Sequence, residues 1–382
     1  MALLDIKNLT LYMDSGSGMV KALEKVSFTL QEGEIKALVG ESGSGKTLVV
    51  RAIIGALPDY WQIKADRLTY KGLDLLTMNY EQRRQIMRRD IAVVFQEPTS
   101  SLDPSIKLGA QIEESIPNEF IDKGWFWQRS RQRREISIGL IHKVGIKDHK
   151  RWLNCYPNEI PADISQKIMI AMALASEPSI LIADDSTRGM ESTTKTQVLR
   201  LLVKLNKTKN LSILFVSHDL LAITSIATSM TVIYCGQTVE SGKVKSLLKR
   251  PLHPYTKALL DSAPSFQSDL ATKSPLKALK GTIPSLQHLP AGCRLGPRCP
   301  NARKECVHVP IMRSIQEHHY SCHYPLHLPT KNKSTQSASK KPYMVEKPKQ
   351  DEHANKSKFN NLEEGTTEGI QKEVSDGEGN DG

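Results

Sequence analysis

Apolar residues in the first 230 positions form short runs that alternate with stretches of helical spacing. The runs are rich in valine, isoleucine and leucine, which predicts strands, and they lie at residues 3–11, 26–30, 35–39, 180–183 and 212–216. Helical spacing follows the third and fourth runs, from near Lys46 and over residues 194–205. Strands that alternate with helices indicate a parallel sheet covered on both faces, so we expect an α/β fold.

The rest of the chain departs from this alternation. Between residues 108 and 175 the strand signal fades and helical spacing dominates, which predicts a helical insertion. Residues 252–328 are rich in proline and hold four of the six cysteines, which predicts a loop-rich appendage held together by something other than an apolar core. We therefore expect a main domain over 1–250 with a helical subdomain at about 105–175, an appendage over 251–328, and a disordered polar tail over 329–382.

The net charge of +11 indicates an anionic partner, which can be a nucleotide, a nucleic acid or lipid headgroups. No apolar run approaches the ~18–20 residues that span a bilayer, so any membrane role is expected to be peripheral. Asp5 interrupts the apolar start where a signal peptide would need continuity, which predicts a cytosolic chain. In that compartment, cysteines are expected to be free or to bind metal.

One segment fits the phosphate-binding pattern G-x-x-x-x-G-K-[ST] between a predicted strand and a predicted helix. It consists of Gly40, Glu41, Ser42, Gly43, Ser44, Gly45, Lys46 and Thr47. Backbone N–H groups in such a loop surround the phosphates, while the lysine reaches the β and γ phosphates and the threonine hydroxyl meets Mg²⁺. An ordinary glycine-rich turn is the alternative, and the strand and helix on either side disfavour it.

Two carboxylates, Asp184 and Asp185, end the apolar run at 180–183. This arrangement places one acid near a hydrated Mg²⁺ and the next beside an attacking water. Taken alone, a strand that ends in acids is more often a solvated turn, but the phosphate-binding loop upstream favours the catalytic interpretation. We expect Asp184 on the metal side and Asp185 on the water side.

With two further motifs, the chain resembles the ATP-binding cassette (ABC) transporter ATPases. Residues 93–104, which contain Gln96, look like the glutamine loop of that family, and residues 216–219 look like its switch-histidine motif, with His218 as the histidine. The resemblance implies a P-loop NTPase fold with a mixed sheet. It also implies that Gln96 touches Mg²⁺ and links to membrane subunits, and that His218 contacts the γ phosphate.

Residues 96–104, the segment 253–260 and the cysteine-containing appendage resemble the oligopeptide and dipeptide importer ATPases, and the resemblance extends over about residues 1–328. It implies an ATPase subunit at the cytoplasmic face of the inner membrane that uses ATP and Mg²⁺ to import peptides, antimicrobial peptides included. The implied partners are two permease subunits, a second and different ATPase subunit, and indirectly a periplasmic solute-binding protein.

Two other functions remain as alternatives. One is a low-activity regulatory subunit that binds nucleotide for a membrane transport complex. The other is a soluble cassette ATPase acting on DNA or ribosomes, which would need a second cassette or a coiled-coil insertion that the sequence lacks. Nucleic acid is therefore not an expected partner.

The chain departs from the family pattern at two places that bear on hydrolysis. Residues 160–163, Ile-Pro-Ala-Asp, replace the signature Leu-Ser-Gly-Gly, which grips the γ phosphate of the opposite subunit. Pro161 suits the first helical position and Asp163 suits the helix dipole, so the helix is expected to persist without the gripping hydroxyl. Asp185 replaces the family's glutamate, so slower hydrolysis is expected.

The cysteines of the appendage, Cys293, Cys299, Cys306 and Cys322, are separated by five, six and fifteen residues. Thiolates at such positions can hold an iron–sulfur cluster or zinc, or stay unmetallated. Zinc sites usually show pairs two to four residues apart, which are missing here. The related importers carry a [4Fe-4S] cluster in this region, which the resemblance implies for these four residues.

Residues 125–134 combine aromatic and basic side chains in the helical insertion. They predict either a solvated helical face with two buried aromatic residues or a contact with anionic lipid headgroups. Nucleic acid binding is the third alternative, and no recognition motif accompanies the charge.

Overall fold

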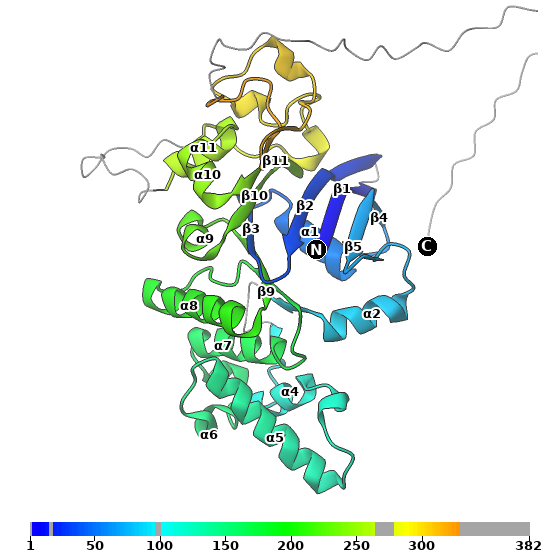
Figure 1. Cartoon of the computed structure of the whole chain (residues 1–382), viewed down its shortest axis with the longest axis vertical. Coiled ribbons are helices and arrows are strands. Elements are labelled where there is room, and N and C mark those ends of the chain that lie inside the picture. The colour runs from blue at the N-terminus through cyan, green and yellow to red at the C-terminus, as the bar shows by residue number, and fades with distance from the viewer. Residues whose placement is uncertain (1, 15–17, 96–100, 264–278, 329–382) are drawn as a thin grey trace, which may run out of the picture. The chain divides into compact units, whose positions relative to one another are not determined.

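The computed structural model describes residues 2–14, 18–95, 101–263 and 279–328. Its largest sheet has eight strands in the order β12-β13-β11-β10-β3-β9-β8-β7. Strands β11, β10, β3 and β9 of this sheet are labelled in Figure 1. The strands are β3 (Ile35–Val39), β7 (Ile91–Val94), β8 (Ile180–Asp184), β9 (Ser212–Ser217), β10 (Ser229–Tyr234), β11 (Gln237–Lys243), β12 (Arg313–Ile315) and β13 (His318–Tyr320). The strands from β7 to β10 pair in parallel and β11 to β13 are antiparallel, so the expected mixed sheet is confirmed.

A second, antiparallel sheet covers one face of the main sheet through a shared core. It is formed by β1 (Ala2–Asp14), β2 (Met19–Gln31), β4 (Trp61–Lys64), β5 (Arg67–Tyr70) and β6 (Leu73–Asp74). Helix α1 (Lys46–Ile54) contributes Val49 and Ile53 to this core, where they join Leu38 of β3. The helix that begins at the phosphate-binding loop is therefore fixed between two sheets, and α2 (Tyr80–Arg89) follows on the outside.

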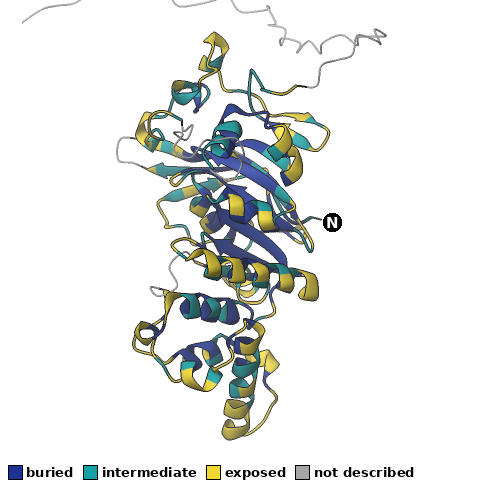
Figure 2. Ribbon diagram, turned by 90° about the vertical axis from the view of Figure 1, so that its left-hand side faces the viewer, coloured by how far each residue is buried: buried dark blue, intermediate teal, exposed yellow. Residues whose placement is uncertain are grey.

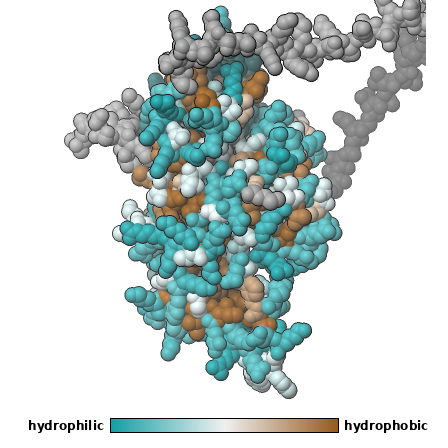
Figure 3. Space-filling view, viewed as in Figure 1, coloured by the Kyte–Doolittle hydropathy of each residue, from teal (hydrophilic) through white to brown (hydrophobic). Residues whose placement is uncertain are grey.

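Between β7 and β8 the described residues form helices only. These are α4 (Leu108–Ser115), η1 (Asn118–Phe120), α5 (Phe126–Lys143), α6 (His149–Trp152), η2 (Pro157–Glu159) and α7 (Ala162–Ala173). Apolar positions such as Leu108, Ile112 and Ile141 are fully buried and join the core on the other face of the main sheet. Buried stretches of the sheets and helices are dark blue in Figure 2. On the face in Figure 3, hydrophobic residues gather over these helices. Helices α8 (Ser192–Lys209) and α9 (Leu220–Ile226) cover the same side of the sheet.

The C-terminal part is attached to the main sheet by backbone pairing and by one buried carboxylate. After α10 (Val244–Lys249) and α11 (Pro254–Asp261) come η4 (Leu286–His288), η5 (Gly296–Arg298) and η6 (Lys304–Val307), and then β12 and β13. Strand β13 pairs with β11. Glu240 of β11 is fully buried, and it accepts the N–H groups of Leu252 and His253 at 2.7 and 2.9 Å and pairs with His318 at 2.6 Å.

Backbone pairing and a buried carboxylate, in addition to a few buried apolar side chains, hold the appendage to the main sheet. Sheet pairing, Glu240 and the buried side chains of Leu295 and Tyr320 supply part of the order. The two strands of the hairpin are three residues long, too short for apolar alternation to be seen in the sequence. Within the part of the chain that the structure describes, no helix is both long enough and apolar enough to cross a membrane.

Candidate nucleotide-binding and catalytic site

The phosphate-binding loop joins β3 to α1 and is packed so closely that two of its glycines have no room for a side chain. A Cβ atom on Gly40 would lie 2.2 Å from the carbonyl oxygen of Ile233. Gly45 has φ of 100°, and a Cβ there would lie 2.7 Å from Leu23. The carbonyl of Ser44 accepts the N–H of Gly236 at 2.8 Å, which ties the loop to the turn after β10. The loop shape is therefore set by its neighbours as well as by its sequence.

Lys46 is buried beneath this loop, with its ammonium directed at loop carbonyls. Its Nζ donates to the oxygens of Gly40 at 2.8 Å and Glu41 at 2.9 Å. Burial lowers the pKa of Lys46, while the carboxylates of Asp185 and Asp184 act in the opposite direction. A cation held here against two carbonyls is placed to transfer its hydrogen bonds to a phosphate.

Asp184 lies at the end of β8, close to the first turn of α1. Burial raises the pKa of the Asp184 carboxyl and the neighbouring Asp185 raises it further, while a hydrogen bond from Thr47 and the charge of Lys46 lower it. Two carboxylates and a hydroxyl therefore share one region with a buried lysine. Such an oxygen-rich group of side chains suits Mg²⁺, which prefers carboxylate and hydroxyl ligands together with phosphate oxygens.

Asp185 and His218 meet because β8 and β9 are adjacent parallel strands whose carboxyl ends lie at the same edge. The Nδ1 of His218 lies 3.0 and 3.2 Å from the two carboxylate oxygens of Asp185. The N–H of Asp185 donates to the carbonyl of Val216 at 2.8 Å, and its backbone is left-handed with φ of 47°. The Asp185 side chain is 13% exposed and that of His218 is 46% exposed, so the pair opens toward solvent.

Gln96, predicted from the sequence to touch Mg²⁺, lies outside the described residues. The structure also brings two residues to the loop that the sequence did not indicate, Tyr255 and Arg298. Both contact Glu41, which is 214 and 257 positions away in the chain. No local sequence pattern marks contacts at such separations.

The altered signature segment forms a helix start, with one difference from the prediction. Pro161 is extended, with φ of −62° and ψ of 151°, and it precedes α7, which begins at Ala162. The expectation that Pro161 occupies the first helical position is therefore wrong by one residue. Asp163 lies in the first turn, and the Nζ of Lys167 is 3.9 Å from its carboxylate, so part of its negative charge is offset within the helix.

The four appendage cysteines line one small cavity of about 10 Å³, together with His253, His323 and Tyr324. All four are half-buried. Burial raises the pKa of Cys293 and Cys299, and it raises that of Cys322 to about 11, with further contributions from the other thiols. Among the residues that the structure describes, no set of three or more His, Cys, Asp or Glu side chains has the arrangement of a metal site. Cys155 is half-buried and Cys235 is buried, apart from this group.

The fold and the site together define an ABC-type ATPase cassette. Residues 23–188 match the family model for ABC transporters, and residues 239–306 match the model for the C-terminal region of oligopeptide/dipeptide transporters. The chain belongs to the ABC transporter ATP-binding proteins of this oligopeptide/dipeptide group. Its relatives agree with that membership.

The chain is 47% identical to the peptide transport system ATP-binding protein SapD of Salmonella typhimurium, over 86% of this chain and 99% of that protein. It is 36% identical to the dipeptide transport ATP-binding protein DppD of Escherichia coli, over 85% of this chain and 98% of that protein. The solved dimeric structure of a bacterial ABC transporter cassette, MJ0796, covers 63% of this chain and 98% of its own, with a TM-score of 0.54 and 24% identity. That likeness concerns the fold.

Proposed function

We propose that the chain is the ATP-binding subunit of an ABC transporter complex that couples ATP binding and hydrolysis to the import of peptides, antimicrobial peptides included. One observation carries the proposal: Lys46, Asp184, Asp185 and His218 converge where the phosphate-binding loop meets the ends of β8 and β9. The names of the relatives, which are peptide and dipeptide transport ATP-binding proteins, supply the substrate class.

Each residue of the site has a distinct task in this proposal. The N–H groups of residues 40–47 and the ammonium of Lys46 bind the phosphates. Thr47, Asp184 and Gln96 hold Mg²⁺, which supplies charge neutralisation on the phosphate oxygens. Asp185 orients and deprotonates the attacking water, and His218, 3.0 Å from Asp185, holds that carboxylate and contacts the γ phosphate.

Titration of Mg-ATP against the purified chain tests the site. Lys46→Ala is expected to remove most of the affinity, because it deletes the buried ammonium beneath the loop. Asp185→Asn is expected to keep binding and abolish turnover. Lys147→Ala, a lysine on the exposed loop after α5, is the matched control and should match the parent. Equal titration curves for the parent and Lys46→Ala would refute the proposal.

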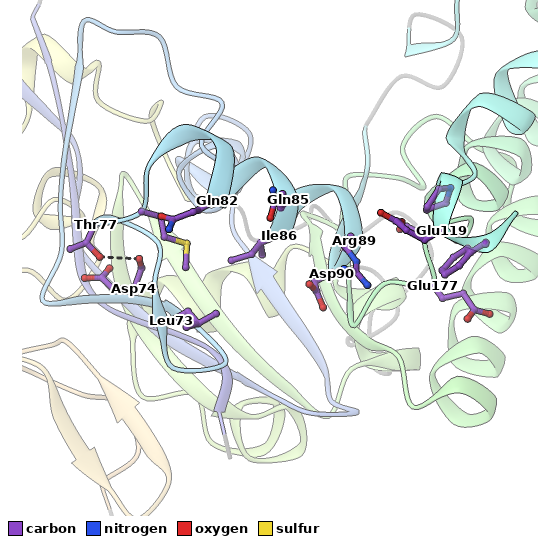
Figure 4. Close-up of a pocket in the computed structure, with 14 residues that line it drawn as sticks. Leu73, Asp74, Thr77, Gln82, Gln85, Ile86, Arg89, Asp90, Glu119 and Glu177 are labelled. Atoms are coloured by element: carbon purple, nitrogen blue, oxygen red, sulfur yellow. Dashed lines mark hydrogen bonds between the residues drawn. The ribbon is translucent and has the colours of Figure 1, made fainter. Parts of the chain in front are cut away.

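A groove beside α2 is the proposed docking place for the permease subunits. Its volume is about 800 Å³, and its walls come from α2, with Gln85 and Arg89, and from η1, with Glu119 and Phe120 (Figure 4). It lies between the sheet-containing part and the helical segment. Movement of one part against the other would therefore shift a permease helix that is bound in the groove. Gln85→Trp should fill the groove and reduce co-purification with the permease pair, and unchanged co-purification would contradict the assignment.

The subunit acts at the cytoplasmic face of the inner membrane in this proposal, and the start of α5 supports a direct contact. Trp125, Phe126 and Trp127 are 78%, 77% and 75% exposed, so the alternative in which two aromatic residues of this run are buried is wrong. Aromatic rings with nearby arginines suit the anionic surface of a bilayer. Trp125→Ser/Trp127→Ser should reduce co-sedimentation with phosphatidylglycerol vesicles, with phosphatidylcholine vesicles as the control. Equal sedimentation of parent and variant would remove this contact from the proposal.

A second, different ATPase subunit is the proposed partner. Pro161 and Asp163 stand where the family has a serine and a glycine, so the partner's nucleotide would meet an altered signature. One site should then turn over and the other mainly hold ATP. Brisk hydrolysis by the purified chain alone as a homodimer would contradict this scheme.

The same departures favour a second candidate function, a low-activity subunit that binds nucleotide and regulates a membrane transport complex. Reconstitution with its permease separates the two. ATP-dependent peptide uptake that Asp185→Asn abolishes supports the importer. Uptake that needs ATP binding and survives Asp185→Asn supports the regulatory subunit.

An iron–sulfur cluster at the four cysteines is also proposed. Its support is that four thiols line one cavity and that thiolate sulfur is the ligand that such clusters use. Bound there, the cluster would supply structural crosslinking or one-electron redox sensing. Anaerobically purified protein should contain about four irons and four sulfides per chain, and Cys299→Ser should lower both. Colourless protein that contains zinc, or no metal, would reject the cluster.

A further inference from the structure

Glu41, the second residue of the phosphate-binding loop, is held at each of its three polar groups. Its carboxylate accepts two hydrogen bonds from Arg298, with Nη1 to Oε2 at 3.0 Å and Nη2 to Oε1 at 3.4 Å. Its N–H donates to the hydroxyl of Tyr255 at 2.8 Å, and its carbonyl accepts from Lys46 at 2.9 Å. Two of these three partners come from the C-terminal appendage.

Tyr255 is itself fixed. It lies in the first turn of α11 with no exposed surface, and its N–H donates to the Nδ1 of His253 at 3.1 Å. Its ring packs against Tyr234 with the centroids 4.6 Å apart. The hydroxyl that accepts the Glu41 N–H therefore has little freedom to move.

Arg298 is fixed in the same way. Its side chain is 9% exposed, and it also donates to the hydroxyl of Tyr234 at 3.2 Å and the carbonyl of Lys280 at 3.2 Å. The turn that carries it is closed by the N–H of Gly296, which donates to the carbonyl of Cys293 at 2.8 Å. The guanidinium thus presents two parallel donors to Glu41 from a rigid base, the geometry in which arginine binds a carboxylate most strongly.

We propose that Arg298 and Tyr255 are positioning residues for nucleotide binding, acting through Glu41. In the loop as it stands, Lys46 donates to the carbonyls of Gly40 and Glu41. A bound phosphate must replace these carbonyls as the acceptor of the Lys46 ammonium. The position of Glu41 therefore sets how easily this exchange occurs and in which direction the loop N–H groups point. The appendage thereby acts on ATP affinity from outside the cassette. This inference rests on the proposed function of the loop.

The test uses the full chain and measures the dissociation constant of Mg-ATP. Arg298→Gln is expected to weaken binding about five- to twentyfold, because it removes two charge-assisted hydrogen bonds from a loop residue that is partly exposed. Tyr255→Phe removes one neutral acceptor and is expected to weaken binding a few-fold. Arg303→Gln, an arginine of the same appendage that stacks on Tyr324, is the matched control and should bind like the parent.

A double-mutant cycle separates positioning from general destabilisation. Glu41→Gln removes the same pair from the loop side, so adding Arg298→Gln to it should change the dissociation constant less than twofold. If Arg298 only stabilised the fold, Arg298→Gln would weaken Mg-ATP binding by the same factor in the parent and in Glu41→Gln. Arg298→Lys, which keeps the charge and loses the paired donors, should restore only part of the affinity.

Two results would overturn the inference. One is that Arg298→Gln and Tyr255→Phe bind Mg-ATP as tightly as the parent. The other is that the variant with both Glu41→Gln and Arg298→Gln loses affinity by the product of the two single-variant factors. Failure of the parent itself to bind Mg-ATP would instead contradict the proposed function. The two failures are therefore distinguishable.

Discussion

His253 provides a pH-dependent test of the junction between the main sheet and the appendage. The side chain is fully buried, and its Nδ1 accepts the N–H of Tyr255 at 3.1 Å, so it caps α11 in the neutral form. Burial lowers the pKa of His253 from 6.5 to about 4, with the nearby Glu240 opposing the change. Protonation would lose the cap and place a cation in a closed site.

The sign and size of the effect follow from linkage. The unfolded chain binds a proton at His253 below pH 6.5, and the folded chain does so only below about pH 4. Unfolding therefore takes up a proton in this window, and the free energy of unfolding falls as pH decreases through it. The difference between the two pKa values, at 1.36 kcal/mol per pH unit, corresponds to a loss of about 3 kcal/mol in the free energy of unfolding below pH 4 and about 2 kcal/mol at pH 5.

Urea unfolding of the parent and of His253→Asn at pH 7.5 and pH 5 measures this contribution. Asparagine retains a side-chain acceptor for the helix cap and does not titrate. Other groups titrate alike in both proteins, so the difference between their pH dependences isolates His253. The parent is expected to lose about 2 kcal/mol more than His253→Asn between the two pH values. Equal losses would refute the assignment of a buried neutral histidine at this junction.

Three further substitutions test the packing around the site. Glu240→Gln should lower the free energy of unfolding by about 2–4 kcal/mol in urea titration. The buried carboxylate makes three hydrogen bonds as an acceptor, and the NH₂ group of glutamine cannot accept them. A loss under 1 kcal/mol would contradict this. Gln166→Met should raise the free energy of unfolding by about 1 kcal/mol, because the buried Gln166 amide has no hydrogen-bond partner among the residues that the structure describes; a decrease would count against this. Gly40→Ala should abolish Mg-ATP binding, since its Cβ would meet the carbonyl of Ile233, and retained affinity would show that the loop can relax.

The strands predicted best from the sequence are those buried on both faces. Strands β3, β8 and β9 lie within one residue of their predicted bounds, because buried parallel strands appear as continuous apolar runs. Strand β2 was predicted over 26–30 and extends over Met19–Gln31, because only Ala22 and Leu23 are buried in its first half, which leaves no long apolar run there. The phosphate-binding loop was recognisable because its pattern is local.

The rest could not be predicted because it depends on tertiary contacts. Nothing near Glu41 in the sequence indicates that Tyr255 and Arg298 hold it. The exposure of Trp127 contradicts a prediction based on hydrophobicity alone, since an aromatic residue is usually buried at least in part. The helix start after Pro161 was misplaced by one residue, a distinction that depends on one backbone angle.

The order of strands in the main sheet has a consequence for synthesis on the ribosome. Strand β3 emerges early, but its two neighbours, β9 and β10, end at residues 217 and 234. At ~5–20 residues per second, β3 waits roughly 10–40 s for its first partner. The small antiparallel sheet, formed within the first 74 residues, has its strands available much sooner. The nascent chain therefore carries an unpaired apolar strand through nearly half of translation, and the contacts that hold Glu41 are completed only after residue 298 has been made.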